Sequence, residues 1–233
     1  DDPCERFIPH SFEEVQIARI DPEIAAKMQK MIAIMEVKLE GQLYERNPDF
    51  HMSDRNVLKK VDFERNVFID NGKEYPLLDT NFPTIDPKDP LALSPEEKDL
   101  LEALKISFSS SIRLQNHIEF IYQVGGLYKI HNGNLLYHGC IPMDENGELQ
   151  IVYLDDKELK GKALMDYLYQ QVRGAWFSPR HSKQRIKGLD LMWYLWCGAK
   201  SPLFGKDKMA TFERYFIDAK ELHEEIKNAY YEY

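Results

Sequence analysis

The sequence has few cysteines and no long apolar run. Its three cysteines, Cys4, Cys140 and Cys197, are too few and too scattered for a disulfide framework, and none belongs to a Cys-x-x-Cys pair of the kind found in zinc and redox sites. We therefore expect the protein to work in a reducing compartment. No stretch approaches the roughly 18 consecutive apolar residues that a membrane span requires. These absences predict a cytoplasmic protein without a membrane partner.

The chain also lacks the short motifs of several enzyme classes. It contains no glycine-rich phosphate loop, no nucleophile elbow and no internal repeat. Its net charge of −9 disfavours non-specific binding of nucleic acid, so we expect no nucleic-acid partner. With 43% hydrophobic and 12% aromatic residues among 233, the composition excludes a disordered chain and predicts one large domain or two small ones.

A long amphipathic helix is predicted to begin at Asp21. Asp21 is a favourable N-cap, Pro22 suits the first helical position, and Glu23 complements the positive end of the helix dipole. Apolar residues then recur every three or four positions and predict one buried face, which we interpret as core: Ile24, Met28, Met31, Ile32, Met35, Leu39 and Leu43.

The next part of the sequence predicts a small exposed hairpin, a loop and a second long helix. Asn71-Gly72 favours a hairpin turn, and three prolines between residues 79 and 90 exclude regular structure there. Ser94 and Glu97 form a capping box at the start of the helix, which is predicted to end at Gly125-Gly126. Its apolar face consists of Leu101, Leu104, Phe108, Leu114, Ile118 and Ile121.

After Gly125-Gly126 the pattern changes to strands and helices. Residues 127–130 and 135–138 flank the turn Asn132-Gly133, and residues 149–154 predict another strand. Two amphipathic helices follow, the second marked by Ile186, Leu189, Trp193 and Trp196. Together with Trp176, these tryptophans are predicted to be core. The fold class is therefore α/β (α+β), with a mainly helical region and one small hairpin at residues 1–124 and strands with helices at residues 125–233.

One candidate site residue stands where an apolar strand ends. His138 closes the segment 135–138 and is followed by Gly139, so its imidazole is held in one orientation and a bound ligand can approach the backbone. Taken alone, this pattern also fits a structural histidine with satisfied hydrogen bonds. Cys140 beside it is a candidate reactive thiol only if its pKa is lowered.

A second candidate is a basic run inside this acidic protein. Residues 167–189 contain no acid and include the loop 178–183, which leads into a helix start where backbone N–H groups and arginine donors can hold phosphate. The basic residues of this run are Arg173, Arg180, Lys183, Arg185 and Lys187, and Lys206, Lys208 and Arg214 beyond it add to the positive charge. The alternative interpretation is an ordinary solvated basic face.

Longer strings connect these patterns to a known family. Residues 127–142 (LYKIHNGNLLYHGCIP), the runs LWCG and SPLFGK within residues 195–206, and residues 209–216 (MATFERYF) resemble the class III fructose-1,6-bisphosphatases of Firmicutes and Bacteroidetes. Residues 1–7 also fit, so the resemblance covers essentially the whole chain. That family is similar to the calcineurin-like metallophosphatases, which are α/β sandwiches with a two-metal site.

The resemblance implies a manganese-dependent fructose-1,6-bisphosphate 1-phosphatase of gluconeogenesis. By this resemblance His138 would ligate one of two manganese ions, and fructose 1,6-bisphosphate would be the partner. Its second phosphate would be held by basic residues among Arg173, Arg180, Lys183, Arg185, Lys206 and Lys208. A homo-oligomer is a candidate assembly. The more distant calcineurin-like metallophosphatases have a His-Gly-Gly segment at the position of His138 and Gly139. This chain departs from that segment, because Cys140 stands in place of its second glycine.

The chain lacks the other metal-binding segments of that superfamily. We find no Gly-Asp-x-x-Asp, Gly-Asn-His-Asp or late Gly-His segment, and Asp49-Phe50-His51 matches Asp-x-His as letters only, since no apolar strand precedes it. The chain is therefore predicted to be the middle portion of a family member and inactive alone. Residues 1–124 would be an insertion, and residues 125–233 an incomplete metallophosphatase core. The alternative is a non-catalytic helical interaction or assembly module.

Overall fold

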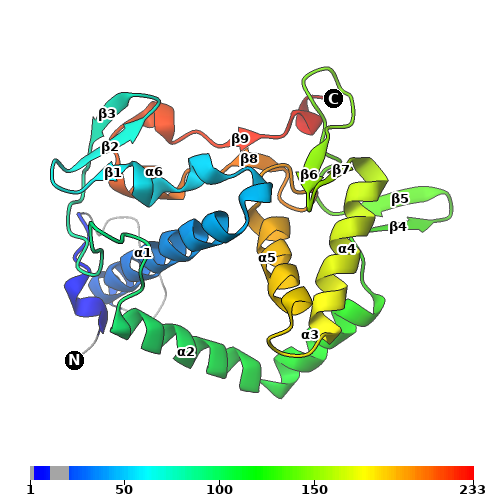
Figure 1. The fold of residues 1–233 in the computed structure, drawn as a ribbon, viewed down its shortest axis with the longest axis horizontal. Helices are drawn as coiled ribbons and strands as arrows, with labels where there is room; N and C mark the ends of the chain where they lie inside the picture. Colours follow the sequence, from blue (N-terminus) through cyan, green and yellow to red (C-terminus); the bar gives the residue numbers. More distant parts are fainter. Residues whose placement is uncertain (1–2, 11–20) are drawn as a thin grey trace. The chain divides into compact units, whose positions relative to one another are not determined.

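The structure, a computed structural model, describes residues 3–10 and 21–233 (Figure 1). Its α-helices are α1 (Pro22–Arg46), α2 (Pro95–Ser110), α3 (Ile112–Val124), α4 (Gly161–Phe177), α5 (Lys183–Cys197) and α6 (Thr211–Phe216). Its strands are β1 (Val61–Asp62), β2 (Val67–Asp70), β3 (Lys73–Pro76), β4 (Tyr128–His131), β5 (Asn134–Tyr137), β6 (Val152–Leu154), β7 (Lys157–Leu159), β8 (Lys206–Lys208) and β9 (Ile226–Lys227). The strands form small antiparallel sheets, so the fold is of the predicted mixed α+β class. The parts of the predictions that fall on residues 1–2 and 11–20 lie outside the described residues.

The chain divides into two compact units. The first comprises Asp1–Ile106 and Ala210–Glu224, and the second comprises Ser107–Met209 and Glu225–Tyr233. The division therefore falls within α2 and differs from the boundary that the sequence predicts at Gly125-Gly126. The change in secondary structure does occur at these glycines, because α3 ends at Val124 and β4 begins at Tyr128.

The capping motifs of the first unit form as predicted. Asp21 Oδ1 accepts the backbone N–H of Glu23 at 2.9 Å, and so Asp21 caps α1. The backbone N–H of Ser94 donates to the Glu97 carboxylate at 2.8 Å, while the N–H of Glu97 donates to Ser94 Oγ at 3.2 Å. This reciprocal pair is the predicted capping box.

The buried face of α1 differs from the predicted apolar stripe. Ile24, Met28 and Ile32 are exposed, whereas Lys30 and Lys38 are buried. A lysine is buried in a protein only when a partner compensates its charge. The prediction is wrong for these positions because apolar periodicity does not reveal which lysines have buried acidic partners.

Two buried ion pairs supply those partners. Lys30 Nζ lies 2.8 Å from Asp79 Oδ2, and Lys38 Nζ lies 2.8 Å from Glu97 Oε2. Lys38 Nζ also donates to the backbone carbonyl of Thr84 at 2.7 Å. Asp79 and Thr84 belong to the proline-rich segment 79–90, which has no helix or strand and wraps against α1, as the sequence predicts for a loop of this composition.

The predicted hairpin is part of a three-stranded sheet. Asn71 (φ 49°) and Gly72 (φ 77°) form the left-handed turn between β2 and β3, and β1 pairs with the other edge of β2. Phe68 on β2 is buried and packs against Phe212 of α6, with ring centroids 5.9 Å apart. The predicted hairpin therefore forms and is largely exposed, and Phe68 anchors it in the core of the first unit.

The helix predicted from Ser94 to Gly125 consists of two helices. α2 ends at Ser110, and Ser111 caps α3 because its Oγ accepts the N–H of Leu114 at 3.4 Å. Serine side chains compete with helical hydrogen bonds and favour such interruptions. Phe108 and Ile121, which we expected to be buried, are exposed.

The second unit contains three antiparallel strand pairs and the packed helices α4 and α5. The β4–β5 hairpin extends outward from these helices (Figure 1) and turns at Asn132 (φ 50°) and Gly133 (φ 77°), as predicted. In the other two pairs, β6 pairs with β7 and β8 pairs with β9. The sequence pattern does not reveal β7, β8 or β9, because each of these strands has only two or three residues.

The apolar face of α5 is also rotated from its predicted position. Leu191, Tyr194 and Leu195 are buried, whereas Ile186 and Leu189 are exposed. Trp196 is 73% exposed, so the prediction of three core tryptophans is wrong for this residue. Within the described part of the chain, no helix is both long enough and apolar enough to cross a membrane.

Candidate functional site

The structure places His138 directly after the last residue of β5. Tyr137 at the end of β5 pairs with Tyr128 at the start of β4, and the tight turn at Asn132-Gly133 fixes this register. His138 therefore follows a hydrogen-bonded strand end, as the sequence predicts, and its side chain is exposed.

Gly139 allows the backbone after His138 to pack closely against a second loop. The N–H of Cys140 donates to the carbonyl oxygen of Pro202 at 2.9 Å. A Cβ atom on Gly139 would lie 2.3 Å from that oxygen and 2.7 Å from the carbonyl oxygen of Leu203. Only glycine fits this approach, so the loop 201–203 holds the His138 segment in place.

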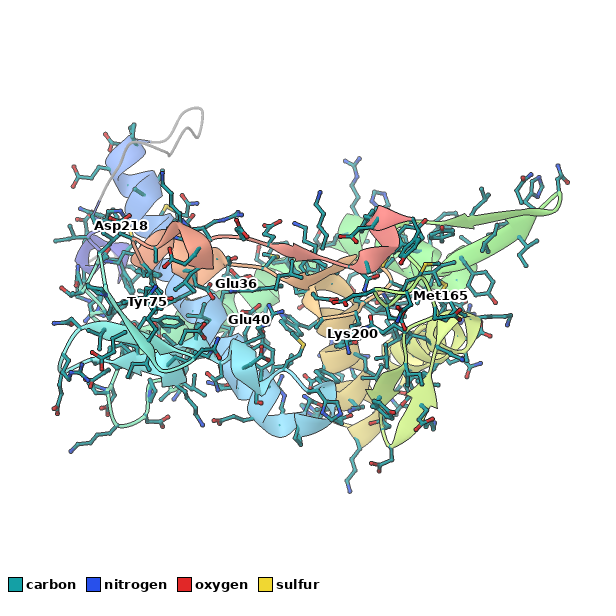
Figure 2. The ribbon with its side chains drawn as sticks, turned by 90° about the horizontal axis from the view of Figure 1, so that it is seen from above. Glu36, Glu40, Tyr75, Met165, Lys200 and Asp218 are labelled. Carbon is teal, nitrogen blue, oxygen red and sulfur yellow. The ribbon has the colours of Figure 1, made fainter. Side chains whose placement is uncertain are left out.

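The second loop is itself fixed by a buried serine. Ser201 Oγ donates to the carbonyl of Leu195 at 2.6 Å and accepts the N–H of Leu203 at 3.2 Å. Lys200, labelled in Figure 2, adopts φ 62°, and its N–H donates to Asp207 Oδ1 at 3.2 Å. The loop is thus tied to the end of α5 and to β8.

Cys140 is a structural residue in this arrangement. Its side chain is fully buried, and its Sγ lies 3.8 Å from the carbonyl oxygen of Ser201. Burial, with a smaller effect of Asp207, raises the pKa of the Cys140 thiol to about 11. The thiol is protonated at neutral pH, which excludes an activated thiolate nucleophile in this conformation.

His138 and Arg173 line the same cavity of the second unit. The cavity is an open groove with a volume of about 560 Å³, and it is lined by the C-terminal part of α3, the segment 125–127, α4, α5 and Leu203. Most of its lining is apolar or aromatic, including Ile121 and Trp196. Its size and lining are typical of ligand or peptide sites with a few orienting polar groups.

Protein groups hold the Arg173 guanidinium in one orientation. Its Nη1 donates to Tyr169 Oη at 2.6 Å and to the backbone carbonyl of Gln123 at 3.4 Å. The guanidinium also lies over the rings of Tyr169 and Phe177, 5.8 Å from each centroid.

The remaining predicted phosphate-binding residues occupy different places. Arg185 Nη1 donates to the backbone carbonyls of residues 175, 176 and 178, at 3.0 to 3.3 Å, and so satisfies the C-terminal end of α4. Lys206 on β8 forms an ion pair with Glu225, and Lys208 ends the same strand. Arg180 is exposed in the loop before α5, and Lys183 is exposed in the first turn of α5. Of the six, only Arg173 lines the cavity with His138.

The described residues do not by themselves fit a manganese site. No three of their His, Cys, Asp or Glu side chains are grouped so that they can hold a metal ion. Asp49 and His51 lie in and just after a 3₁₀ turn (Pro48–Phe50), not at a strand end, which agrees with a chance match to Asp-x-His. His138 is thus an isolated candidate ligand within this part of the chain.

Sequence reasoning missed the contribution of the C-terminal segment. Asn228 is buried, and its Oδ1 accepts the N–H of Met143 at 3.0 Å and that of Tyr230 at 3.1 Å. The hydroxyls of Tyr230 and Tyr137 are hydrogen-bonded, which connects this segment to the strand before His138 and raises the pKa of Tyr137 to about 12. Asn228 and Tyr230 therefore help to fix the segment around His138, a contact that no local sequence pattern indicates.

Comparison with known proteins identifies the class of protein. A family model described as Firmicute fructose-1,6-bisphosphatase matches residues 1–233, so the chain belongs to this family. A curated relative named Fructose-1,6-bisphosphatase class 3 from Clostridium botulinum (strain Loch Maree / Type A3) is 47% identical over 233 residues, which are 100% of this chain and 35% of the relative. A relative of the same name from Clostridium tetani (strain Massachusetts / E88) is 46% identical over 232 residues, with the same coverage. The chain thus spans about a third of the length of these relatives. No solved structure matches it.

Proposed function

We propose that the chain is part of an enzyme that hydrolyses fructose 1,6-bisphosphate at its 1-phosphate in gluconeogenesis. The observation that carries this proposal is the family match over residues 1–233, which includes both the helical region and the region around His138. The relatives of which the chain spans 35% are named fructose-1,6-bisphosphatases, and this supports the same substrate here. The match also covers residues 1–124, which disfavours the alternative that the chain is a non-catalytic helical interaction or assembly module.

The proposal includes the calcineurin-like metallophosphatase architecture, a manganese-dependent reaction and a cytoplasmic location. In such enzymes two metal ions supply charge neutralisation and an activated water. The part of the chain that the structure describes provides one candidate ligand, His138, and the other ligands would lie outside it. The small antiparallel sheets would then be the periphery of a larger sandwich, and residues 1–124 an insertion into it.

The roles of His138 and Arg173 in the full-length protein are distinguishable by kinetics. We expect His138→Ala to lower kcat by a factor of about 10² or more, with partial recovery at high manganese, because metal occupancy follows mass action. We expect Arg173→Ala to raise KM mainly, because a clamp on the distant phosphate binds ground and transition states about equally.

The matched control is His131→Ala, an exposed histidine in the same hairpin. It should leave both constants unchanged. If His138→Ala keeps the parent kcat at low manganese, the metal assignment is wrong. If Arg173→Ala leaves KM unchanged, its role is confined to the contacts with Tyr169 and Gln123.

The isolated 233-residue chain is expected to be inactive. With a single candidate metal ligand it should bind manganese weakly, because several ligands are needed to hold two metal ions. Phosphate release from fructose 1,6-bisphosphate by the purified chain, measured with and without manganese, tests this. Manganese-dependent turnover would show that the ligands of this chain are sufficient. Sequencing of the encoding DNA on both sides would separately test for the missing ligand segments.

A further inference from the structure

The cavity beside His138 has a rim of exposed apolar side chains. Ile121 on α3 is 61% exposed and Trp196 on α5 is 73% exposed, and both line the cavity. In the described structure α3 buries none of its side chains, although Phe120 and Val124 are also large and apolar. An apolar surface of this kind usually marks an interaction site, since leaving it in water is unfavourable.

Contacts between α3, α4 and α5 fix the shape of the groove. Tyr122 on α3 stacks on Trp176 of α4 with ring centroids 5.0 Å apart and an interplanar angle of 16°. Its hydroxyl also contacts the sulfur of Met192 on α5 at 3.0 Å. These contacts join the three helices, so the groove between them does not depend on an occupant for its shape.

The charge of the groove is of one sign. Among the described residues that line it, none is acidic, and Arg173 and His138 are the two that can carry a positive charge. Arg173 is held by Tyr169 and Gln123, so its charge has a fixed place at the groove. A complementary occupant therefore presents apolar side chains and no basic group near Arg173.

We propose that this groove is the docking site for an apolar segment, without a basic side chain opposite Arg173, from the part of the longer family protein that this chain does not span. The relatives are about three times as long as the chain, because it covers 35% of them, so polypeptide for this contact is present in the same molecule. A segment on the same chain has a high effective concentration, which favours it over a second copy. The proposal rests on the proposed function in taking the chain as part of a longer enzyme, and it goes beyond that function because it requires neither metal nor substrate.

Thiol labelling tests the proposal directly. Ile121→Cys is introduced into the full-length protein and into the 233-residue chain, and the rate of maleimide labelling is measured by mass spectrometry, with the native cysteines as background. The control is Glu158→Cys, an exposed position on β7. We expect the thiol at position 121 to react at least about tenfold more slowly in the full-length protein, because docking protects it, and the thiol at position 158 to react equally in both.

Other results would overturn the proposal. Equal rates at position 121 would show that the groove stays open. Protection that appears in the 233-residue chain and grows with its concentration would assign the groove to a second copy. As an independent measurement, Ile121→Glu should lower the melting temperature of the full-length protein and leave that of the 233-residue chain unchanged, because the side chain is exposed there. Unchanged melting of both would also contradict docking.

Discussion

Lys38 and Glu97 form a closed, water-excluded network in the first unit. Both side chains are 0% exposed, and Lys38 Nζ is 2.8 Å from Glu97 Oε2, 2.7 Å from Thr84 O and 3.3 Å from Thr84 Oγ1. Thr84 Oγ1 donates to Glu97 Oε1 at 2.5 Å, and the N–H of Ser94 donates to Glu97 Oε2 at 2.8 Å. Every proton of the ammonium group therefore has an acceptor, and both carboxylate oxygens accept.

Removal of one charge from this network should be strongly destabilising. Lys38→Met keeps a side chain of similar length but leaves the Glu97 carboxylate buried without a counter-charge, a change that typically costs about 3–5 kcal/mol. If Glu97 acted only through the capping box, its loss would cost about 1 kcal/mol. The expected magnitude thus separates a buried ion pair from an ordinary helix cap.

A double-mutant cycle isolates the interaction. Lys38→Met with Glu97→Gln removes both charges while the amide oxygen can still accept from Ser94, so the double variant should lose less stability than the sum of the single variants, with a coupling of about 2–3 kcal/mol. The control is Lys59→Met, which breaks an exposed ion pair with Glu45 and should change little.

Urea unfolding followed by far-UV circular dichroism gives the free energies of unfolding, and hydrogen exchange of the α1 amides locates the change. If Lys38→Met lowers the free energy of unfolding by less than about 1 kcal/mol, Lys38 and Glu97 do not form a strongly stabilising buried ion pair. A coupling energy near zero would lead to the same conclusion, since it would show that the two charges act independently.

Two further predictions concern the loop after β5. Because burial raises the pKa of Cys140 to about 11 from an ordinary value of 9.0, its thiol resists ionisation in the folded state, so the folded protein should lose stability between about pH 9 and 11. The loss should approach about 1.4 kcal/mol per pH unit, and Cys140→Ala should reduce this slope in urea titrations at several pH values; an unchanged slope would contradict the assignment. Gly139→Ala should destabilise the second unit by about 1–3 kcal/mol, since its Cβ would meet backbone oxygens at 2.3 and 2.7 Å. The matched control is Gly126→Ala, whose Cβ would have its nearest neighbour at 3.3 Å, and equal melting temperatures for the two variants would refute the steric argument.

Local sequence motifs determined the starts and turns of the elements. The Asp21 cap, the Ser94–Glu97 capping box and the Asn-Gly turns before β3 and β5 form as predicted, because each depends on backbone groups within a few residues. The position of His138 at a strand end follows from the same local turn. The longer strings also indicated the family, which the match over residues 1–233 confirms.

The tertiary structure decided which faces are buried and what each charged side chain contacts. Ile32 and Trp196 fit apolar stripes but are exposed, while Lys38 is buried because Glu97, far away in the sequence, lies against it. Arg185 looks like a phosphate ligand in a basic run, yet its donors satisfy the end of α4. The periodicity of apolar residues along a helix indicates an apolar face but does not show which element packs against that face. Whether a charged side chain is buried, or which acceptor its N–H groups bind, depends on a partner that only the folded chain brings within reach.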